Sequence, residues 1–338
     1  MGLCLPSREA STRFKQSETD PACWPWRGCL NANVTMHTRP TSATESSRLL
    51  LVDGHAYAYR AFHAIRQLSS PTGAPTNAIY GFIKVLAKMQ VQLAPSHLLV
   101  VWDGGLAAER MAALPEYKSQ RPPMPDSLEK QIAALNRYLD AANIAKSCQE
   151  GVEADDWIAS MARQGVVAGL AVVIASSDKD FLQLVSPRVG LLNSNDKSEK
   201  IWTAEDVRAK TGVAPEQIVD WLSLIGDSVD NIAGVPGVGP KTAADLLRQF
   251  GTVEALFQRL EEVKSERLRA NLESSLKVVR RNQQLIRLKD DLPGHFDLGS
   301  TLVKPPDPKQ LRPLYAEWGF KSMLEKVTAL STAQADLL

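Results

Sequence analysis

Nine carboxylates recur in five short clusters along the middle of the chain, and most follow an apolar run that predicts a β-strand. In an open parallel sheet the strands end on one common edge, so residues just past those ends meet in one crevice. Two carboxylates about 4 Å apart repel by about 4 kcal/mol at an effective dielectric of about 20. Divalent cations relieve such repulsion, and oxygen-only ligands favour Mg²⁺ or Mn²⁺. The candidate metal ligands are Asp53, Asp103, Glu153, Asp155, Asp156, Asp178, Asp180, Asp227 and Asp230.

A Mg²⁺ centre rich in carboxylates is typical of enzymes that cut or transfer phosphate esters, so we expect this chain to cut nucleic acid. A single aspartate at a strand end is more often a turn former or a helix cap. Asp126 and Asp206 are interpreted as such caps or first-turn acids. Capping does not account for five clusters that coincide with successive strand or helix ends.

A second motif runs GVPGVGPKT over residues 234–242. It nearly matches a phosphate-binding P-loop, but Pro240 separates the last glycine from the lysine and no apolar strand leads into it. We interpret it as a helix-hairpin-helix turn, in which a helix beginning near Pro240 presents backbone N–H groups to a phosphate. The alternative is a plain loop between two helices, although three glycines in six residues exceed what a loop needs. The candidate phosphate-gripping residues are Gly234, Gly237, Gly239, Lys241 and Thr242.

The hydrophobic pattern predicts an α/β half followed by an all-helical half. Predicted strands lie at 49–53, 97–102, 170–175 and 189–193, and predicted helices at 76–93, near 127–141 and from 153 onward. Strand, helix, strand in this order predicts a parallel sheet covered on both faces. After about residue 203 the strands are expected to stop, and the chain predicts helices at 204–211, 215–225, 240–249, 253–261, 264–286 and 309–328.

A length of 338 residues predicts about two domains. We expect residues 1–47 to be a disordered extension or a misassigned start, with Met36 as the alternative initiator. The nuclease core is expected at 48–202, and a helical DNA-binding subdomain at 203–330 with its helix-hairpin-helix at 231–250. Residues 331–338 are expected to be a tail.

The net charge of +1 averages an acidic site against basic segments, so contact with nucleic acid must come from local patches. No apolar run approaches 18 residues, which excludes a helix that spans a membrane. Residues 1–47 lack the apolar stretch of a secretory signal and carry four acids, which transit peptides usually avoid. We therefore expect a cytoplasmic, nucleoid-associated protein, with import into an organelle as the open alternative.

Five segments in order resemble the successive motifs of the bacterial 5′-3′ exonuclease (flap endonuclease) family, which includes the N-terminal nuclease domain of DNA polymerase I. They are VDGHAYAYRAFHA, PEYKSQRPPMP, GVEADDW, SSDKDFLQLV and GDSVDNIAGVPGVGPKTAADLL, and the match spans about residues 48–330. The resemblance implies a parallel-sheet core of the PIN-like or FEN-like kind with a helical arch near 104–127, followed by an H3TH helical subdomain. Ala233, where relatives often carry proline, is a departure that touches no acid.

The resemblance also implies roles for single residues. Asp53, Asp103, Glu153 and Asp155 would hold one metal with Asp156 nearby, while Asp155, Asp178, Asp180 and Asp230 would hold or approach the second, and Asp227 would lie farther out. Tyr117, Lys118 and Arg121 match the basic segment of the arch, where the two cations would neutralise charge developing on the scissile phosphate. Arg60 would steer a phosphate, and hairpin carbonyls around 234–239 would bind K⁺.

The implied activity is structure-selective 5′-3′ exonuclease and flap endonuclease cleavage of DNA in replication and repair. The implied partners are DNA with 5′ flaps or nicks, RNA–DNA hybrids and a separate DNA polymerase, because the chain resembles a stand-alone, monomeric nuclease.

Two other classes of function stay open. A PIN-like ribonuclease would share the acids but lack the YKSQRPPMP segment and the hairpin, and a non-catalytic DNA-binding module would keep the hairpin while losing acids.

Overall fold

The computed structural model describes residues 47–193, 196, 198–294 and 297–335 of the chain, so the expectation for residues 1–46 lies outside the described residues. At its centre is a six-stranded sheet with strand order β3-β2-β1-β4-β5-β6. Five strands are parallel, and β6 at the edge is antiparallel. They are β1 (Arg48–Asp53), β2 (His97–Trp102), β3 (Ala145–Cys148), β4 (Ala171–Ser176), β5 (Val189–Asn193) and β6 (Ile201–Trp202).

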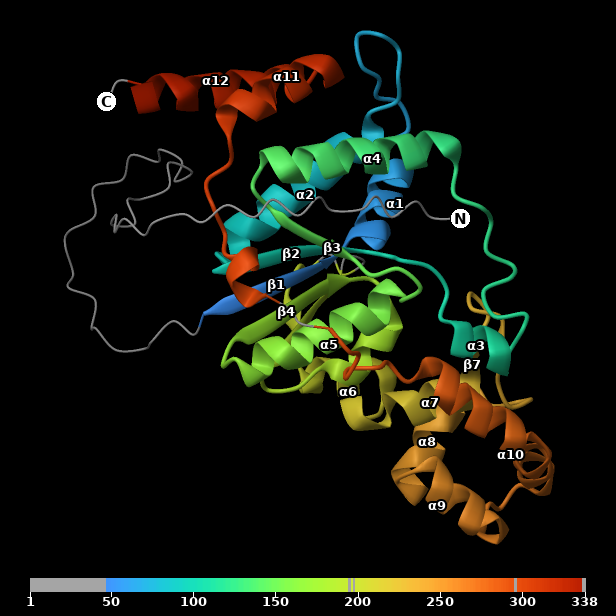
Figure 1. Cartoon of the computed structure of the whole chain (residues 1–338). Coiled ribbons are helices and arrows are strands. Elements are labelled where there is room, and N and C mark those ends of the chain that lie inside the picture. The colour runs from blue at the N-terminus through green and yellow to red at the C-terminus, as the bar shows by residue number, and fades with distance from the viewer. Residues whose placement is uncertain (1–46, 194–195, 197, 295–296, 336–338) are drawn as a thin grey trace.

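The sheet is covered on both faces, as predicted (Figure 1). Successive residues of β1 alternate, so that Leu50 and Val52 face one layer and Leu49 and Leu51 face the other. The first layer consists of α1 (Gly54–Ala64), α2 (Asn77–Leu93), α4 (Asp126–Ala141), α11 (Pro308–Trp318) and α12 (Lys321–Ala335). The second layer begins with α5 (Ala154–Val167).

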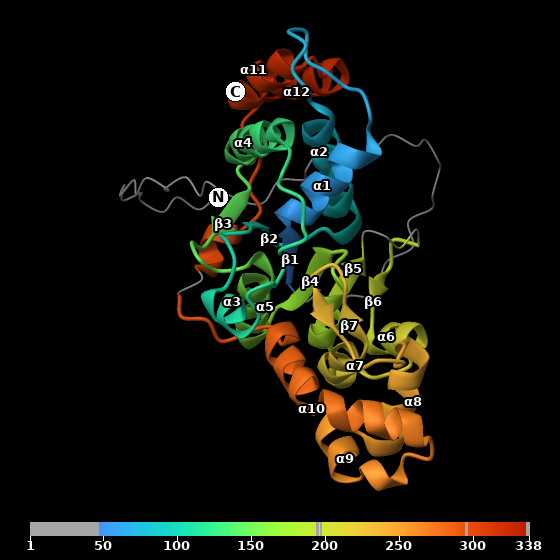
Figure 2. The same ribbon diagram turned by 90° about the vertical axis from the view of Figure 1, so that its right-hand side faces the viewer.

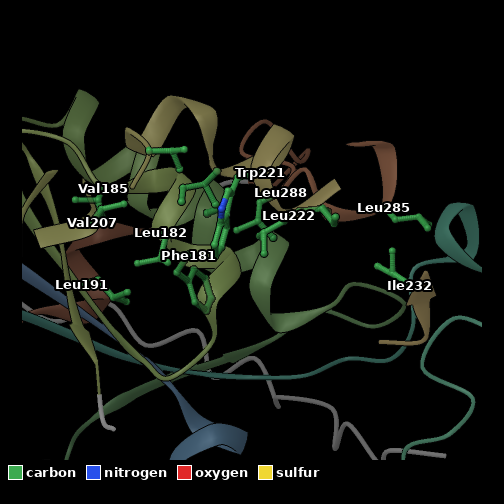
Figure 3. Packing of buried hydrophobic residues seen from close by; sticks show 14 of the residues in the cluster. Phe181, Leu182, Val185, Leu191, Val207, Trp221, Leu222, Ile232, Leu285 and Leu288 are labelled. Atoms are coloured by element: carbon green, nitrogen blue, oxygen red, sulfur yellow. The ribbon is translucent and has the colours of Figure 1, made fainter. Parts of the chain in front are cut away.

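The helical half extends the second layer away from the sheet (Figure 2). Its helices are α6 (Ala204–Thr211), α7 (Ile218–Ile225), α8 (Pro240–Phe250), α9 (Val253–Gln258) and α10 (Glu266–Ile286). Short 3₁₀ turns lie at η1 (Lys179–Leu184), η2 (Pro215–Gln217), η3 (Leu260–Glu262) and η4 (Leu298–Thr301). In Figure 3, Phe181 and Leu182 of η1, between β4 and β5, pack together with Trp221 and Leu222 of α7. One hydrophobic core therefore runs through both halves.

The predicted helix-hairpin-helix lies between α7 and α8. Gly239 is the N-cap of α8 and Pro240 its first residue, as the sequence predicted. The turn is closed by hydrogen bonds from Val235 N–H to Leu224 O (2.8 Å) and from Val238 N–H to Val235 O (3.0 Å). Gly237 has a φ of +79°, a left-handed conformation that favours glycine.

Several elements differ from the prediction. The strands do not stop at 203, because β7 (Gly226–Asp227) and β8 (Ile232–Ala233) form a two-residue antiparallel ladder before the hairpin. Strand β3 is short and polar, and β6 has two residues, so neither has an apolar run to reveal it. Helix α1 was missed because it follows β1 without a gap and buries small residues such as Ala58 and Ala61.

The helix predicted at 309–328 is two helices, α11 and α12, separated at Gly319 with a φ of +74°. Leu311, Tyr315 and Trp318 of α11 pack in the first layer with α2 and α4, so this segment does not join the other helices of the predicted 203–330 subdomain. Helix α12 continues to Ala335, into the predicted tail.

The segment expected to form an arch, 104–127, contains the short helix α3 (Ala108–Ala113) and then turns until α4 begins at Asp126. It is docked on the turn between β7 and β8, because Lys118 N–H donates to Asp230 O (3.1 Å) and Asn231 Nδ2 donates to Glu116 O (3.0 Å). Within the part of the chain that the structure describes, no helix is long and apolar enough to cross a membrane.

Gly234 offers a test of the hairpin. A Cβ at this position would lie 2.3 Å from the backbone C and O of Ile225, so we expect Gly234→Ala to lower the free energy of unfolding by about 2 kcal/mol. The matched control is Gly239→Ser, because a Cβ there meets nothing within 4 Å and serine is a favoured N-cap. Urea unfolding of both variants measures the difference, and equal midpoints would show that the turn tolerates a side chain at Gly234.

Candidate active site

A pocket of about 490 Å³ opens where the parallel strands end. Six of the nine predicted metal ligands and two of the three predicted catalytic residues line it. The charged residues in its wall are Asp53, Asp103, Lys118, Arg121, Asp155, Asp178, Lys179, Asp227 and Asp230. Strand order brings these residues together, because β1, β2 and β4 are neighbours in the sheet although they are far apart in the sequence.

Asp53 is the last residue of β1, and Asp103 directly follows β2. Asp53 caps α1, where its Oδ1 accepts from Ala56 N–H (3.0 Å), and its Oδ2 accepts from Ser176 Oγ (2.8 Å). Asp103 accepts from Gly105 N–H (2.8 Å) and from Ala154 N–H (3.3 Å) at the start of α5. The same hydrogen bonds that begin two helices therefore hold both carboxylates toward the pocket.

The acids at this edge of the sheet carry more negative charge than the nearby lysine and arginine side chains neutralise. Burial raises the pKa of Asp53 to about 6, and the charges of Asp178 and Asp103 act in the same direction, against hydrogen bonds from Ala56 and Ser176. Burial and Asp178 raise the pKa of Asp155 well above its usual range, and they do the same to the pKa of Asp180, which does not line the pocket. The pKa of Asp178 is also raised, first by burial. These acids fit a bound divalent cation, which would supply the missing positive charge.

The last two acids lie in β7 and in the turn that joins it to β8. Asp227 contacts Lys179 (3.2 Å) and accepts from Val229 N–H (3.0 Å). The buried Asp230 forms an ion pair with Arg121, whose guanidinium is partly exposed. The ladder missing from the sequence prediction therefore carries these two acids to the pocket.

Lys118 lines the pocket as predicted, but it is paired with Glu153, which does not line it. Glu153 is fully buried and is not part of the pocket wall, because its carboxylate pairs with Lys118 and accepts from Ala107 N–H (3.1 Å) and Tyr117 Oη (3.2 Å). Burial raises the pKa of Glu153, but Lys118 and Arg110 outweigh it and lower that pKa. Lys118 therefore neutralises a buried acid in this structure, and Tyr117 lies behind it rather than in the pocket.

Asp156 is also placed differently from the prediction. It is buried and faces Arg110, whose Nη1 and Nη2 donate to its two oxygens at 2.7 and 2.8 Å. Asp156 Oδ1 accepts a third hydrogen bond from Lys289 N–H (2.9 Å). We therefore do not assign it to a metal, since its lone pairs are used away from the pocket.

The acids are not arranged around an ion as they stand. Among the described residues, no three His, Cys, Asp or Glu side chains lie close enough together to enclose a metal ion. Their carboxylates instead turn to backbone N–H groups and to lysine or arginine, as for Asp178, whose Oδ1 accepts from Asp180 N–H (2.8 Å). Mutual repulsion favours this arrangement, and binding of a cation would require side-chain rotation.

The predicted phosphate-gripping residues lie on the helical half, outside the pocket wall. Lys241 is exposed in the first turn of α8 and Thr242 is half-buried beside it. Gly234, Gly237 and Gly239 form the turn itself. Arg60 is exposed on α1 and does not line the pocket.

Sequence reasoning missed three residues that hold the site. His55 Nδ1 accepts from Asp103 N–H (3.0 Å), Ser176 donates to Asp53, and Arg110 binds Asp156. The histidine and the serine lie within two residues after the end of a predicted strand, and this position was the signal by which the sequence could have indicated them. Arg110 had no such signal.

Comparison with known proteins decides the family. Residues 48–212 match the 5′-3′ exonuclease N-terminal resolvase-like domain, and residues 213–309 match the 5′-3′ exonuclease C-terminal SAM fold. A 5′-3′ exonuclease of Aquifex aeolicus is 38% identical over 279 residues, which cover 82% of this chain and 94% of that protein. This chain belongs to the 5′-3′ exonuclease family. It is therefore related to nucleases that hydrolyse phosphodiester bonds.

Other similarities agree with this 5′-3′ exonuclease assignment. DNA polymerase I of Bacillus caldotenax is 38% identical over 289 residues, covering 85% of this chain and 33% of the polymerase. The chain thus spans about a third of the length of the polymerase relatives it matches. The solved structure of T5 5′-exonuclease with divalent zinc ions bound has a TM-score of 0.60 at 24% identity, covering 72% of this chain and 90% of that one. That likeness establishes the shared fold.

Asp53 gives a test of the uncompensated charge. The rise of its pKa from 3.8 to about 6 corresponds to about 3 kcal/mol of destabilisation once the carboxyl is ionised in both folded and unfolded states. We therefore expect Asp53→Asn, which keeps an N-cap, to raise the Tm of the protein in EDTA near neutral pH. The gain should fade as the pH drops through 6 toward 3.8, where the wild-type carboxyl becomes protonated.

The matched control is Asp307→Asn. Asp307 also caps a helix, but it is outside the pocket and its hydrogen bonds with Gln310 and Lys309 lower its pKa. Its replacement should not raise the Tm. Addition of Mg²⁺ should stabilise the wild type more than Asp53→Asn, by the usual linkage of ligand binding to folding. An Asp53→Asn protein that melts at or below the wild-type temperature in EDTA would contradict the charge argument.

Proposed function

We propose that this protein hydrolyses phosphodiester bonds near the 5′ end of DNA, at flaps, nicks and RNA primers, during DNA replication and repair. The observation that carries the proposal is one pocket in which six carboxylates face Lys118 and Arg121. Acids alone would repel a DNA phosphate. Acids that hold divalent cations, together with two side-chain cations, form a site of net attraction for it.

The donor set suits Mg²⁺, for which Mn²⁺ would substitute. Two bound ions would lower the pKa of an attacking water and stabilise the leaving oxygen. Asp53, Asp103 and Asp155 would hold one ion, and Glu153 would join them only after Lys118 releases it. Asp155, Asp178, Asp180 and Asp230 would hold the second, with Asp227 farther out.

The cations of the 104–127 segment would act on the phosphate. Arg121 is partly exposed at the pocket, so its guanidinium can donate to a phosphate oxygen while its Nη2 stays paired with the carboxylate of Asp230. Lys118 is held by Glu153 and would exchange this partner for the scissile phosphate. Tyr117 Oη donates to Glu153 and would keep that carboxylate in place during the exchange. Arg60 on α1 would steer the 5′ strand.

The hairpin would grip duplex DNA by its backbone. The N-terminus of α8, with Lys241 and Thr242, suits a phosphate and reads no bases. Gly234, Gly237 and Gly239 would let the DNA backbone approach, and carbonyls of 234–239 would hold K⁺. We further propose that the protein acts as a monomer associated with the nucleoid, beside a separate DNA polymerase, and that RNA–DNA hybrids are substrates as well.

Labelled 5′-flap, nicked, blunt and RNA-primed DNA test this function directly. We expect Mg²⁺-dependent release of 5′ products, fastest from flaps and nicks. Asp103→Ala should abolish cleavage in Mg²⁺ and leave DNA binding in Ca²⁺ largely intact, because it removes a metal ligand and no cation that contacts DNA. Cleavage by the wild type in EDTA, or robust cleavage by Asp103→Ala, would overturn two-metal catalysis.

Lys118 gives a second test. If its ammonium group contacts the phosphate as charge develops, Lys118→Met should lower the single-turnover rate by about 10²-fold and affinity by far less. Rapid-quench measurement at saturating enzyme separates the two effects. Lys118→Arg should restore part of the rate, and thermal unfolding of each variant controls for the loss of the pair with Glu153. An unchanged rate with weakened binding would reduce Lys118 to a steering charge.

A further inference from the structure

Arg110 connects three parts of the molecule that lie far apart in the sequence. Its side chain is only 5% exposed and lies where α3, α5 and the end of α10 meet. Beyond its paired contact with Asp156, its Nε donates to Leu285 O (2.8 Å) and its Nη2 donates to Arg287 O (3.2 Å). Its Nη1 lies 3.4 Å from Glu153 Oε1.

These contacts use the particular shape of arginine. A planar guanidinium offers five N–H groups in a fixed fork, so it can bind a carboxylate with two parallel hydrogen bonds and still donate to carbonyls at its edge. The carbonyls of Leu285 and Arg287 belong to the C-terminal end of α10, where a positive charge is also favoured by the helix dipole. A lysine would supply the charge but not this set of contacts.

The other end of the connection is the hairpin. Asn282 of α10 is fully buried, and its Nδ2 donates to Ser223 O (3.0 Å) on α7 and to Ala233 O (2.8 Å) on β8. Asn271 Nδ2 donates to Pro236 O (2.9 Å) within the turn. Helix α10 therefore holds the hairpin with two asparagines and meets Arg110 at its C-terminal end.

Hydrogen bonds thus connect the hairpin to α10 and the end of α10 to Arg110, and an ion pair connects Arg110 to Glu153. Glu153 pairs with Lys118, which lines the pocket. The contacts around Arg110 and Asn282 are largely buried, and buried polar groups hold their geometry because an unpaired partner would be costly.

We propose that Arg110 is a positioning residue that couples the grip of the hairpin on downstream duplex to the placement of Glu153 and Lys118 at the pocket. The inference rests on the function proposed above. Asp156 serves in this device as the fixed partner of Arg110 and not as a ligand of the metals. Duplex bound at the hairpin raises the cleavage rate because α10 then holds Arg110, and through it Glu153, in the arrangement that the reaction needs.

A role in folding alone would make a different prediction. If Arg110 only stabilised the fold, its replacement would change cleavage of every substrate by one common factor. If Arg110 couples duplex binding at the hairpin to the pocket, its replacement removes the higher cleavage rate that a long downstream duplex gives. The cleavage rate on a short duplex should then change much less. The ratio of the two rates is therefore the quantity that separates the two roles.

The experiment measures single-turnover cleavage of the same 5′ flap on a downstream duplex of roughly 20 or roughly 4 base pairs. The two duplexes differ in length because each base pair adds about 3.4 Å. We expect the wild type to cut the long substrate at least about tenfold faster at saturating enzyme, and Arg110→Lys to bring this ratio close to one. The matched control is Arg137→Lys, because Arg137 forms a similar two-bond pair with Glu317, but an exposed one between α4 and α11. It should keep the wild-type ratio.

Asp156→Asn is the second variant, in case Arg110→Lys does not fold. This substitution leaves the contacts of Arg110 with the carbonyls of α10 and with Glu153, but it weakens the two-bond pair with residue 156. The ratio of the long-duplex rate to the short-duplex rate should therefore fall to a value between those of the wild type and Arg110→Lys. Thermal unfolding identifies variants that are folded. A folded Arg110→Lys or Asp156→Asn with the wild-type ratio would overturn the proposal. A wild type that cuts no 5′ flap would instead contradict the proposed function, and one that cuts both lengths equally would overturn the coupling alone.

Discussion

The repulsion among buried carboxylates at one edge of the sheet is the constraint on which the rest of the structure depends. The fold brings six acids to the wall of one pocket, where burial and mutual charge raise several of their pKa values. A protein accepts such a site only if its core supplies enough stability elsewhere, because ionised groups without partners are costly to bury. Here the shared core of sheet and helices, seen in Figure 3, supplies it.

The same constraint explains where the positive residues are. Lys118 is only 8% exposed, yet Glu153 and Asp155 keep its pKa above the usual range against the effect of burial. Arg121 forms an ion pair with Asp230, and Lys179 forms one with Asp227. Each of these three cations neutralises an acid. Two of them, Lys118 and Arg121, belong to the segment 104–127, so charge as well as hydrogen bonds to the turn between β7 and β8 holds this segment on the site.

Much of this arrangement could be predicted from the sequence, for identifiable reasons. Asp53, Asp103 and Asp178 follow apolar strands, and in a parallel sheet the order of strands alone places such residues together. Glu153 and Asp156 share the same short motif as Asp155, but successive residues of a helix start point in different directions, so the motif could not reveal which acid reaches the pocket. The role of Arg110 could not be predicted from the sequence, because its partners include two backbone carbonyls more than 170 residues away. Contacts of that kind leave no pattern along the chain.

The place of α11 and α12 has a consequence for how the chain folds during synthesis. These helices cover the sheet face that also carries α2 and α4, although they are made after the entire helical half. The helical half is thus inserted between two pieces of one hydrophobic layer. When the ribosome has finished β6, the last strand of the central sheet, Phe82, Tyr138 and their neighbours still lack the part of their cover that α11 and α12 supply. The first layer of the α/β half is therefore completed only after the helical half has been made, and until then part of its apolar face lacks its cover.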